Sequence, residues 1–181
     1  MSTTVRWITA AALVIAAWFV AWLTPDDDAH WSDPFVVPAE VGETATARDL
    51  VATVDQVSWT PSVSTASWQD EGTWLVIDLT VASRTEPKGI WATLEIDGDT
   101  YAPSNRPPTT EAGLGSARLI AGVPQSGALA FELPDDASGA AVLHLSNISD
   151  TRLDSVIDVT IDLDATDEVA HVDLPKYGWA S

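Results

Sequence analysis

The chain lacks cysteine entirely, across all 181 residues. This absence excludes disulfide bonds, thiolate-ligated zinc, thiol catalysis and lipid attachment at a cysteine side chain. It does not locate the protein, because many exported bacterial domains also lack cysteine.

Basic residues are scarce, with 8 Lys and Arg against 27 Asp and Glu, and the formal net charge is −19. Such a surface repels phosphate backbones, so we expect no nucleic-acid partner. Anionic lipid headgroups are repelled for the same reason. The charge favours cations or a basic partner, but solubility, or adaptation to a saline environment or a high-GC background composition, is the preferred explanation.

Sequence motifs for catalysis and for cofactors are also missing. No nucleophile elbow, phosphate-binding loop or dinucleotide fingerprint occurs. His30, His144 and His171 have no histidine partner at a helical metal-binding spacing. The acidic pairs do not match a calcium-binding loop, and turn chemistry explains Asp97-Gly98-Asp99 better. These pairs are Asp97 with Asp99, Asp135 with Asp136, and Asp162 with Asp164. We therefore expect no catalytic residue, no metal ligand, no cofactor and no enzyme.

One long apolar run is present, and it lies at the N-terminus. Residues 7–23 read WITAAALVIAAWFVAWL without a charge. As a helix this run rises about 26 Å, close to the hydrocarbon thickness of a bilayer. Trp7 and Trp22 stand near its ends, where indole rings prefer the membrane interface, and Pro25 ends it. We predict a transmembrane anchor.

Two alternatives to an uncleaved anchor remain open. A cleaved signal peptide needs small residues before its cut, and Trp18, Phe19 and Trp22 interrupt that region. A buried helix of a soluble protein is the other alternative. For an anchor, Arg6 is the only basic residue near either end, so the positive-inside rule predicts a cytoplasmic N-terminus (residues 1–6) and an extracytoplasmic C-terminal domain.

After the anchor, residues 24–42 are rich in Pro and Asp and are typical of a tether, within which Phe35–Val37 has the character of a short edge strand. From there the apolar residues recur with period two, which indicates strands with one wet face. The slip between Val54 and Val57 indicates a bulge. The alternating segments are 50–59, 75–81, 90–96, 129–133, 143–145 and 157–163.

The connecting segments favour antiparallel pairing. Asp97-Gly98 is a hairpin signal, and 60–72 and 102–116 read as longer loops. No amphipathic helix of ten or more residues is evident after the anchor. We predict an all-β, antiparallel β-sandwich over residues 43–164, with a small barrel as the alternative. Residues 165–181 form a tail that contains a possible extra strand at 169–174.

Strand and turn residues follow one another in a recognisable order. They are the strand GTWLVI (72–77) ending near Ser83, then Leu94, Gly98 and Tyr101, then Gly122-Val123-Pro124, then 127–134 and Leu143. In this order they resemble the Ig-like ectodomains of unknown function that Gram-positive bacteria carry on anchored or lipidated surface proteins. Mycobacterial secreted immunogenic antigens share that sandwich. The resemblance covers about residues 48–163, and it implies that the predicted antiparallel sandwich is Ig-like.

The sequence departs from that family in places. Ser83 stands where Asn is common, Ala121 where Pro is common, and a helix replaces the lipid-bearing cysteine. The family has no established catalytic residues, so the resemblance implies an extracytoplasmic sandwich that binds or scaffolds a partner.

The tryptophans are the sharpest candidate for a binding site. The alternation places Trp74 and Trp91 on the face opposite the core, on strands expected to be neighbours, and Trp59 and Trp68 flank the preceding loop. Exposed aromatic patches mark interaction sites, so Trp68, Trp74 and Trp91 are predicted to bind sugar rings of an envelope polymer or a partner protein. The alternative is that the loop or the tail covers them, or that the strand phase is shifted by one residue.

Three candidate functions of different classes remain, and each requires a different structural feature. The first is a membrane-anchored, extracytoplasmic binding or accessory domain, which requires an exposed aromatic patch. The second is a structural or stress-related acidic envelope protein, which requires buried tryptophans. The third is a hydrolase, which requires a deep pocket that gathers carboxylates with His144 or His171.

Overall fold

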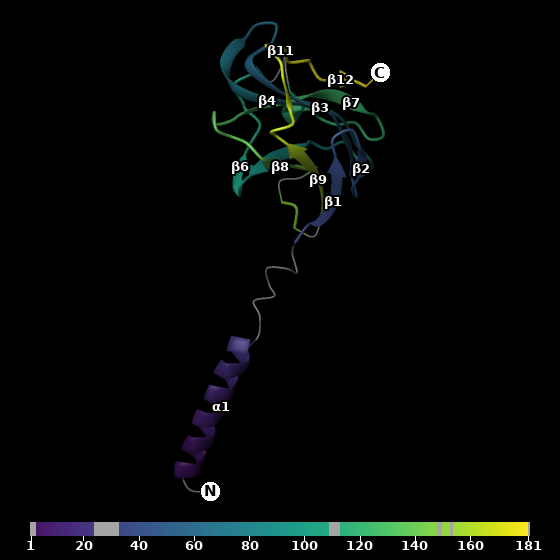
Figure 1. Ribbon diagram of the computed structural model, residues 1–181. Coiled ribbons are helices and arrows are strands. Elements are labelled where there is room, and N and C mark those ends of the chain that lie inside the picture. The colour runs from purple at the N-terminus through teal and green to yellow at the C-terminus, as the bar shows by residue number, and fades with distance from the viewer. Residues whose placement is uncertain (1–2, 24–32, 109–112, 148–149, 153, 181) are drawn as a thin grey trace. The chain divides into compact units, whose positions relative to one another are not determined.

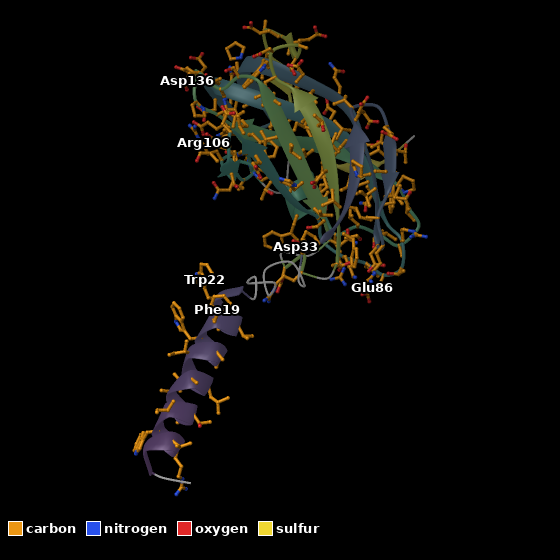
Figure 2. All side chains as sticks on the ribbon, turned by 60° about the horizontal axis from the view of Figure 1, so that its bottom comes forward. Phe19, Trp22, Asp33, Glu86, Arg106 and Asp136 are labelled. Carbon is orange, nitrogen blue, oxygen red and sulfur yellow. The ribbon has the colours of Figure 1, made fainter. Side chains whose placement is uncertain are left out.

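The computed structural model describes residues 3–23, 33–108, 113–147, 150–152 and 154–180 (Figure 1). The chain divides into two units, residues 1–33 and 34–181, and each is described by itself. The first unit contains helix α1, Thr3–Leu23. Its stretch Val5–Trp22 has a mean hydropathy of 1.7, and it is long and apolar enough to cross a membrane. A signal sequence has the same properties. Figure 2 shows Phe19 and Trp22 projecting from this helix.

The predicted tether is shorter at its C-terminal end than the sequence indicated. Residues 24–32, including His30, lie outside the described residues. Residues 34–42 belong to the second unit, because β1 (Phe35–Glu40) pairs along its whole length with β9 (Ser155–Asp162). The edge strand expected at Phe35–Val37 is therefore present and extends to Glu40.

The second unit is a sandwich of two sheets, as predicted. Sheet A has the strand order β1-β9-β8-β5-β6, and sheet B has the order β10-β3-β4-β7-β12, with β2 and β11 also paired to β3. The remaining strands are β2 (Thr44–Thr46), β3 (Leu50–Ser64), β4 (Gln69–Ser83), β5 (Trp91–Ile96), β6 (Asp99–Tyr101), β7 (Gln125–Glu132), β8 (Ala140–Ser146), β10 (Asp167–Glu168), β11 (Val172–Asp173) and β12 (Gly178–Trp179). A short 3₁₀ turn, η2, spans Leu114–Ser116.

The connectivity is of the Ig-like, Greek-key kind. β4 pairs with β7 in sheet B, while β5 pairs with β8 in sheet A, so the chain crosses between sheets after β4 and again after β6. The pairing is not antiparallel throughout. β1 runs parallel to β9, and β10 and β11 run parallel to β3.

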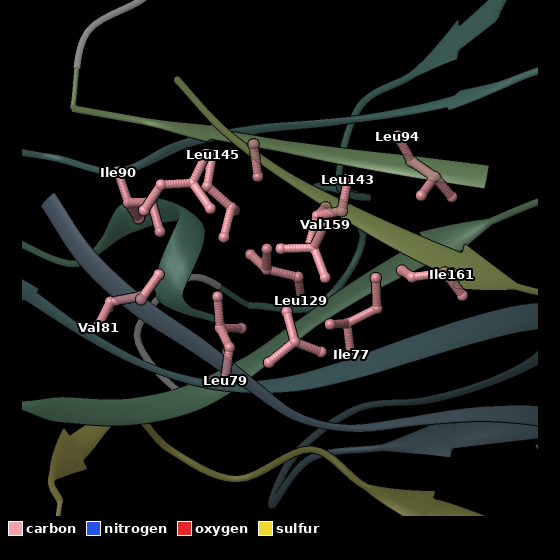
Figure 3. Packing of buried hydrophobic residues seen from close by; sticks show 14 of the residues in the cluster. Ile77, Leu79, Val81, Ile90, Leu94, Leu129, Leu143, Leu145, Val159 and Ile161 are labelled. Carbon is pink, nitrogen blue, oxygen red and sulfur yellow. The ribbon is translucent and has the colours of Figure 1, made fainter. Parts of the chain in front are cut away.

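The core lies between the two sheets and is built from the inward-facing residues of the alternation. Leu129 of β7, Leu143 of β8 and Val159 of β9 are almost completely buried there (Figure 3). Their alternating neighbours face away from this core, as a period of two requires. Charged side chains such as Glu86 and Asp136 are exposed on the outside (Figure 2).

Two local predictions are confirmed and one is wrong. The register of β3 against β4 shifts between Val54 and Gln56, where the bulge was expected. Asp97 and Gly98 both have positive φ, 50° and 87°, in the two-residue turn between β5 and β6. The expected loop at 60–72 is instead mostly strand, because β3 continues to Ser64 and β4 begins at Gln69. Serine and threonine at alternate positions hid the apolar period there.

Candidate binding face around Trp91

Trp74 corrects the predicted patch, because its side chain is completely buried (0% exposed). It does lie on the face of sheet B opposite the main core, as the alternation indicated. That face carries a second apolar cluster, formed by Val63, Trp74, Val76, Ala128, Ala130 and Leu174. Leu174 comes from the C-terminal tail, where β11 pairs with Val63 and Ser64 of β3. The tail therefore covers part of the face on which the sequence predicted exposed tryptophans.

Trp68 is partly buried against the same cluster. Its ring meets that of Trp74 edge-on, with 6.1 Å between centroids and planes 86° apart. The indole Nε1 of Trp74 has no hydrogen-bond acceptor among the described residues. Trp59, which flanks the same region, packs against the main core and donates from Nε1 to the carbonyl oxygen of Leu163 at 3.1 Å. None of these three rings forms an open platform.

Trp91 differs from the others, because 56% of it is exposed. It lies at the start of β5 on the outer face of sheet A. Trp74 and Trp91 are not neighbours, since β4 and β5 belong to different sheets although they are consecutive strands. The predicted Trp74–Trp91 pair is therefore wrong, and Trp91 alone of the three predicted residues is exposed.

The outer face of sheet A places polar side chains in a row next to Trp91. The register pairs Thr93 with His144 and His144 with Asp158, across β5, β8 and β9. His144 Nδ1 lies 2.7 Å from a carboxylate oxygen of Asp158, and His144 Nε2 lies 3.4 Å from one of Glu95. This row presents carboxylate acceptors and an imidazole in a fixed arrangement. It begins at Thr93, two residues along β5 from the indole of Trp91.

A hollow of about 210 Å³ lies beside these residues. Its wall includes Trp91, Thr93 and His144 from the strands. Pro34, Ala92, Ser146, Thr151 and Val156 complete the lining. Val156 is buried although it faces outward, so this end of sheet A is already partly covered. The site combines an open aromatic ring, a shallow hollow and hydrogen-bonding groups, which is the composition of a binding surface.

A second polar cluster involves His171, and no pattern in the sequence indicated its partners. His171 Nδ1 lies 3.1 Å from Ser62 Oγ, and His171 Nε2 lies 2.9 Å from Ser64 Oγ. The Ser64 hydroxyl donates to Asp173, and hydrogen bonds from Ser64 and then His171 hold the pKa of that carboxyl below its ordinary value.

Ser, His and Asp are the residue types of a catalytic triad of hydrolases, but the surroundings of these three residues differ from those of a triad. The side chain of Asp173 is 86% exposed and that of His171 is 40% exposed, so water screens their charges. The cluster joins the tail strand β11 to the end of β3, which is a structural role.

The acidic pairs considered for calcium are engaged in turns. Asp162 accepts from the backbone N–H groups of Asp164 and Ala165, Asp164 accepts from Gly139 N–H, and Asp135 accepts from the Thr73 hydroxyl. Across the part of the chain that the structure describes, no group of three or more His, Asp or Glu side chains is placed to hold a metal ion.

Comparisons with known proteins add little. No protein-family model matches the chain, and no curated protein matches it. Among solved structures it is similar to an uncharacterized β-sandwich protein from Clostridium difficile 630, with 7% sequence identity and a TM-score of 0.46. The match covers 72% of this chain and 97% of that one.

Proposed function

We propose that this protein is a membrane-anchored, extracytoplasmic binding domain that engages a component of the cell envelope through the face around Trp91, and that it acts by binding rather than by catalysis. The observation that carries the proposal is the half-exposed indole of Trp91 beside the Thr93–His144–Asp158 row. Large aromatic side chains left open next to fixed polar groups are the usual anchors of recognition surfaces.

The chemistry of this face favours a neutral glycan as the envelope component. The indole offers a flat apolar surface to the C–H face of a sugar ring. The carboxylates of Glu95 and Asp158, together with His144, offer hydrogen-bonding groups to hydroxyls around that ring. A net charge of −19 disfavours anionic polymers. A partner protein with an apolar, basic surface is the other outcome of the test.

The placement outside the cytoplasm rests on the N-terminal helix. Val5–Trp22 is sufficient for one membrane crossing, and Arg6 favours a cytoplasmic N-terminus. The resemblance to Gram-positive surface ectodomains supports the same arrangement. A cleaved signal sequence would release the domain instead, and the mass of the mature protein in the membrane fraction distinguishes the two.

A purely structural acidic protein is the competing function. It requires buried tryptophans; Trp74 is completely buried, and Trp68 is partly buried. Trp91 does not meet this requirement, because more than half of it is in contact with solvent. Since Trp179 is exposed as well, it is the position of Trp91 beside the Thr93–His144–Asp158 row that favours a binding role.

The test is crosslinking of the tagged full-length protein in intact cells, followed by identification of the captured material. Trp91→Ala is compared with Trp179→Ala, a matched control because Trp179 is 66% exposed on sheet B. We expect Trp91→Ala to lose a specific partner or polymer that the wild type and Trp179→Ala retain. Identical capture by all three proteins would refute the proposal.

A further inference from the structure

A second cavity, of about 340 Å³, opens at the side of the sandwich where β5 extends beyond its short edge partner β6 and β7 extends beyond its short edge partner β12. Its three main walls are Ile90–Thr93 from the start of β5, Ala102–Asn105 from the loop after β6, and Ala128–Ala130 from β7. Pro107, Gly113, Gly115 and Leu174 complete the lining. Trp91, Ala92 and Thr93 also line the hollow on the outer face of sheet A, but the other walls of the two cavities differ.

The cavity exists because β6 is short. It pairs only with Leu94–Ile96, after which the chain crosses to sheet B, where Ser104 N–H donates to the Ala130 carbonyl at 2.7 Å. In a two-residue hairpin the pair next to the turn, Ile96 and Asp99, is hydrogen-bonded. Ala92, four residues before Ile96, therefore directs its N–H and C=O to the same margin, and no described strand pairs with it there. The cavity thus has an apolar lining with a few backbone polar groups at its edge.

Among the residues that the structure describes, the lining bears no charge, in a chain with 27 acidic residues. None of its fifteen residues is Asp, Glu, Lys, Arg or His, and its polar side chains are those of Thr93, Ser104 and Asn105. A charged ligand would lose its hydration here without gaining a partner, which is costly. A neutral, largely apolar ligand is the class that fits.

The volume sets the size of that ligand. An apolar protein cavity of about 150 Å³ accommodates benzene, with its six carbons. A cavity of about 340 Å³ is a little more than twice as large, so it suits a chain of about ten to twelve carbons. Pockets in this size range are typical of small-molecule sites that are mostly apolar with a few placed polar groups.

We propose that this cavity holds the alkyl tail of a neutral, single-chain amphiphile taken from the membrane. The inference rests on the proposed function in one respect, because the membrane anchor is what brings the domain close to the source of the ligand. The ten residues 24–33 between α1 and the sandwich span at most about 35 Å, so lipid is within reach of the domain. The net charge of −19 disfavours anionic headgroups near the opening and favours neutral ones.

The experiment is photolabelling of the full-length protein in bilayers of neutral lipid. The probe is a monoacylglycerol with a twelve-carbon chain and a diazirine near the chain end. Labelled peptides are mapped by mass spectrometry. Two variants fill the cavity: Gly115→Leu, whose added carbon would start 3.9 Å from Leu129 Cδ2, and Ala102→Trp at an exposed lining position. Gly89→Leu is the control, because open space surrounds its Cβ position.

We expect label on the three cavity walls in wild type and in Gly89→Leu, and at least a fivefold loss of that label in both filled variants. Label on α1 reports separately on the membrane anchor. Label on α1 without label on the cavity walls would overturn this inference and leave the anchor standing. Cavity label that persists unchanged in both filled variants would also overturn it. Cavity label without α1 label would instead contradict the anchor.

The charge preference is tested by competition. Unlabelled monolaurin should displace the cavity label at lower concentration than laurate, whose headgroup is anionic. Equal displacement by the two competitors, or stronger displacement by laurate, would contradict the neutral class of ligand.

Discussion

The guanidinium carbon of Arg106 lies 5.8 Å from the centroid of the Trp74 ring. Arg106 comes from the loop after β6, and it makes ion pairs with Asp70 of β4 and with Glu132 of β7, the latter at 2.8 Å. The hydrogen bond with Glu132, more than any other contact, raises the pKa of Arg106. The Arg106 side chain thus covers one part of the outer apolar cluster, and Leu174 of the C-terminal tail covers another. Together they bury Trp74.

Trp74→Ala should destabilise the fold strongly. Removing a large, fully buried aromatic side chain leaves a cavity and costs about 3–5 kcal/mol. Trp91→Ala should cost less than about 1 kcal/mol, because the ring is more than half exposed. Urea unfolding of the full-length variants in non-ionic detergent, followed by far-UV circular dichroism, measures both. Equal losses for the two variants would mean that the outer cluster is not a second core.

Lys88→Met should make the stability less dependent on pH. Lys88 Nζ lies 2.7 Å from Asp49, and this hydrogen bond lowers the pKa of Asp49 below its ordinary value of 3.8. The carboxylate therefore stabilises the fold above pH 3.8, and this contribution disappears as the pH falls through the lowered pKa. Lys88 has a pKa raised above 10.5 by the same bond, so its contribution disappears as the pH rises beyond that value.

At pH 7 we expect Lys88→Met to lose about 1 kcal/mol, since the pair is only partly shielded from water. Lys176→Met is the control, because Lys176 is the only other lysine and is exposed. The difference between the two variants should vanish in unfolding experiments near pH 2. A difference that is constant from pH 2 to pH 7 would be inconsistent with the ion pair as its source.

Gly98→Ala should weaken the β5–β6 hairpin. Gly98 has φ of +87°, where a Cβ is strained, so we expect a loss of about 1 kcal/mol. Gly89→Ala is the comparison, because its φ is not in the left-handed region and its Cβ position is open. It should be neutral or stabilising by up to about 1 kcal/mol. Thermal unfolding compares the two, and the opposite order would show that the turn does not hold its assigned conformation.

The sequence was sufficient to predict which face of each strand is buried, but not which strands lie next to each other. Alternation identified Leu129, Leu143 and Val159 as core residues, because the side-chain period of a strand is two whatever the sheet. It could not show that β4 and β5 lie in different sheets, since strand pairing depends on contacts distant in sequence. Treating consecutive strands as neighbours produced the incorrect Trp74–Trp91 pair.

The site was predictable only in part for a related reason. Alternation shows that Trp74 faces away from the main core, but it does not show what covers that outer face. The cover comes from Arg106 and Leu174, about 30 and 100 residues later in the chain. Trp91 has no such cover, and only the three-dimensional arrangement distinguishes it from Trp74. His171 was unpredictable for the same reason, since its partner Ser64 is 107 residues away.

The most direct test of the central claim is the affinity of the full-length protein, in bilayers, for the envelope component captured by crosslinking. The Trp91 face predicts that Trp91→Ala weakens this affinity at least tenfold, which corresponds to about 1.4 kcal/mol, while Trp179→Ala stays within twofold of wild type. An unchanged affinity for Trp91→Ala, in a protein that unfolds at the wild-type urea concentration, would contradict the claim that this face binds.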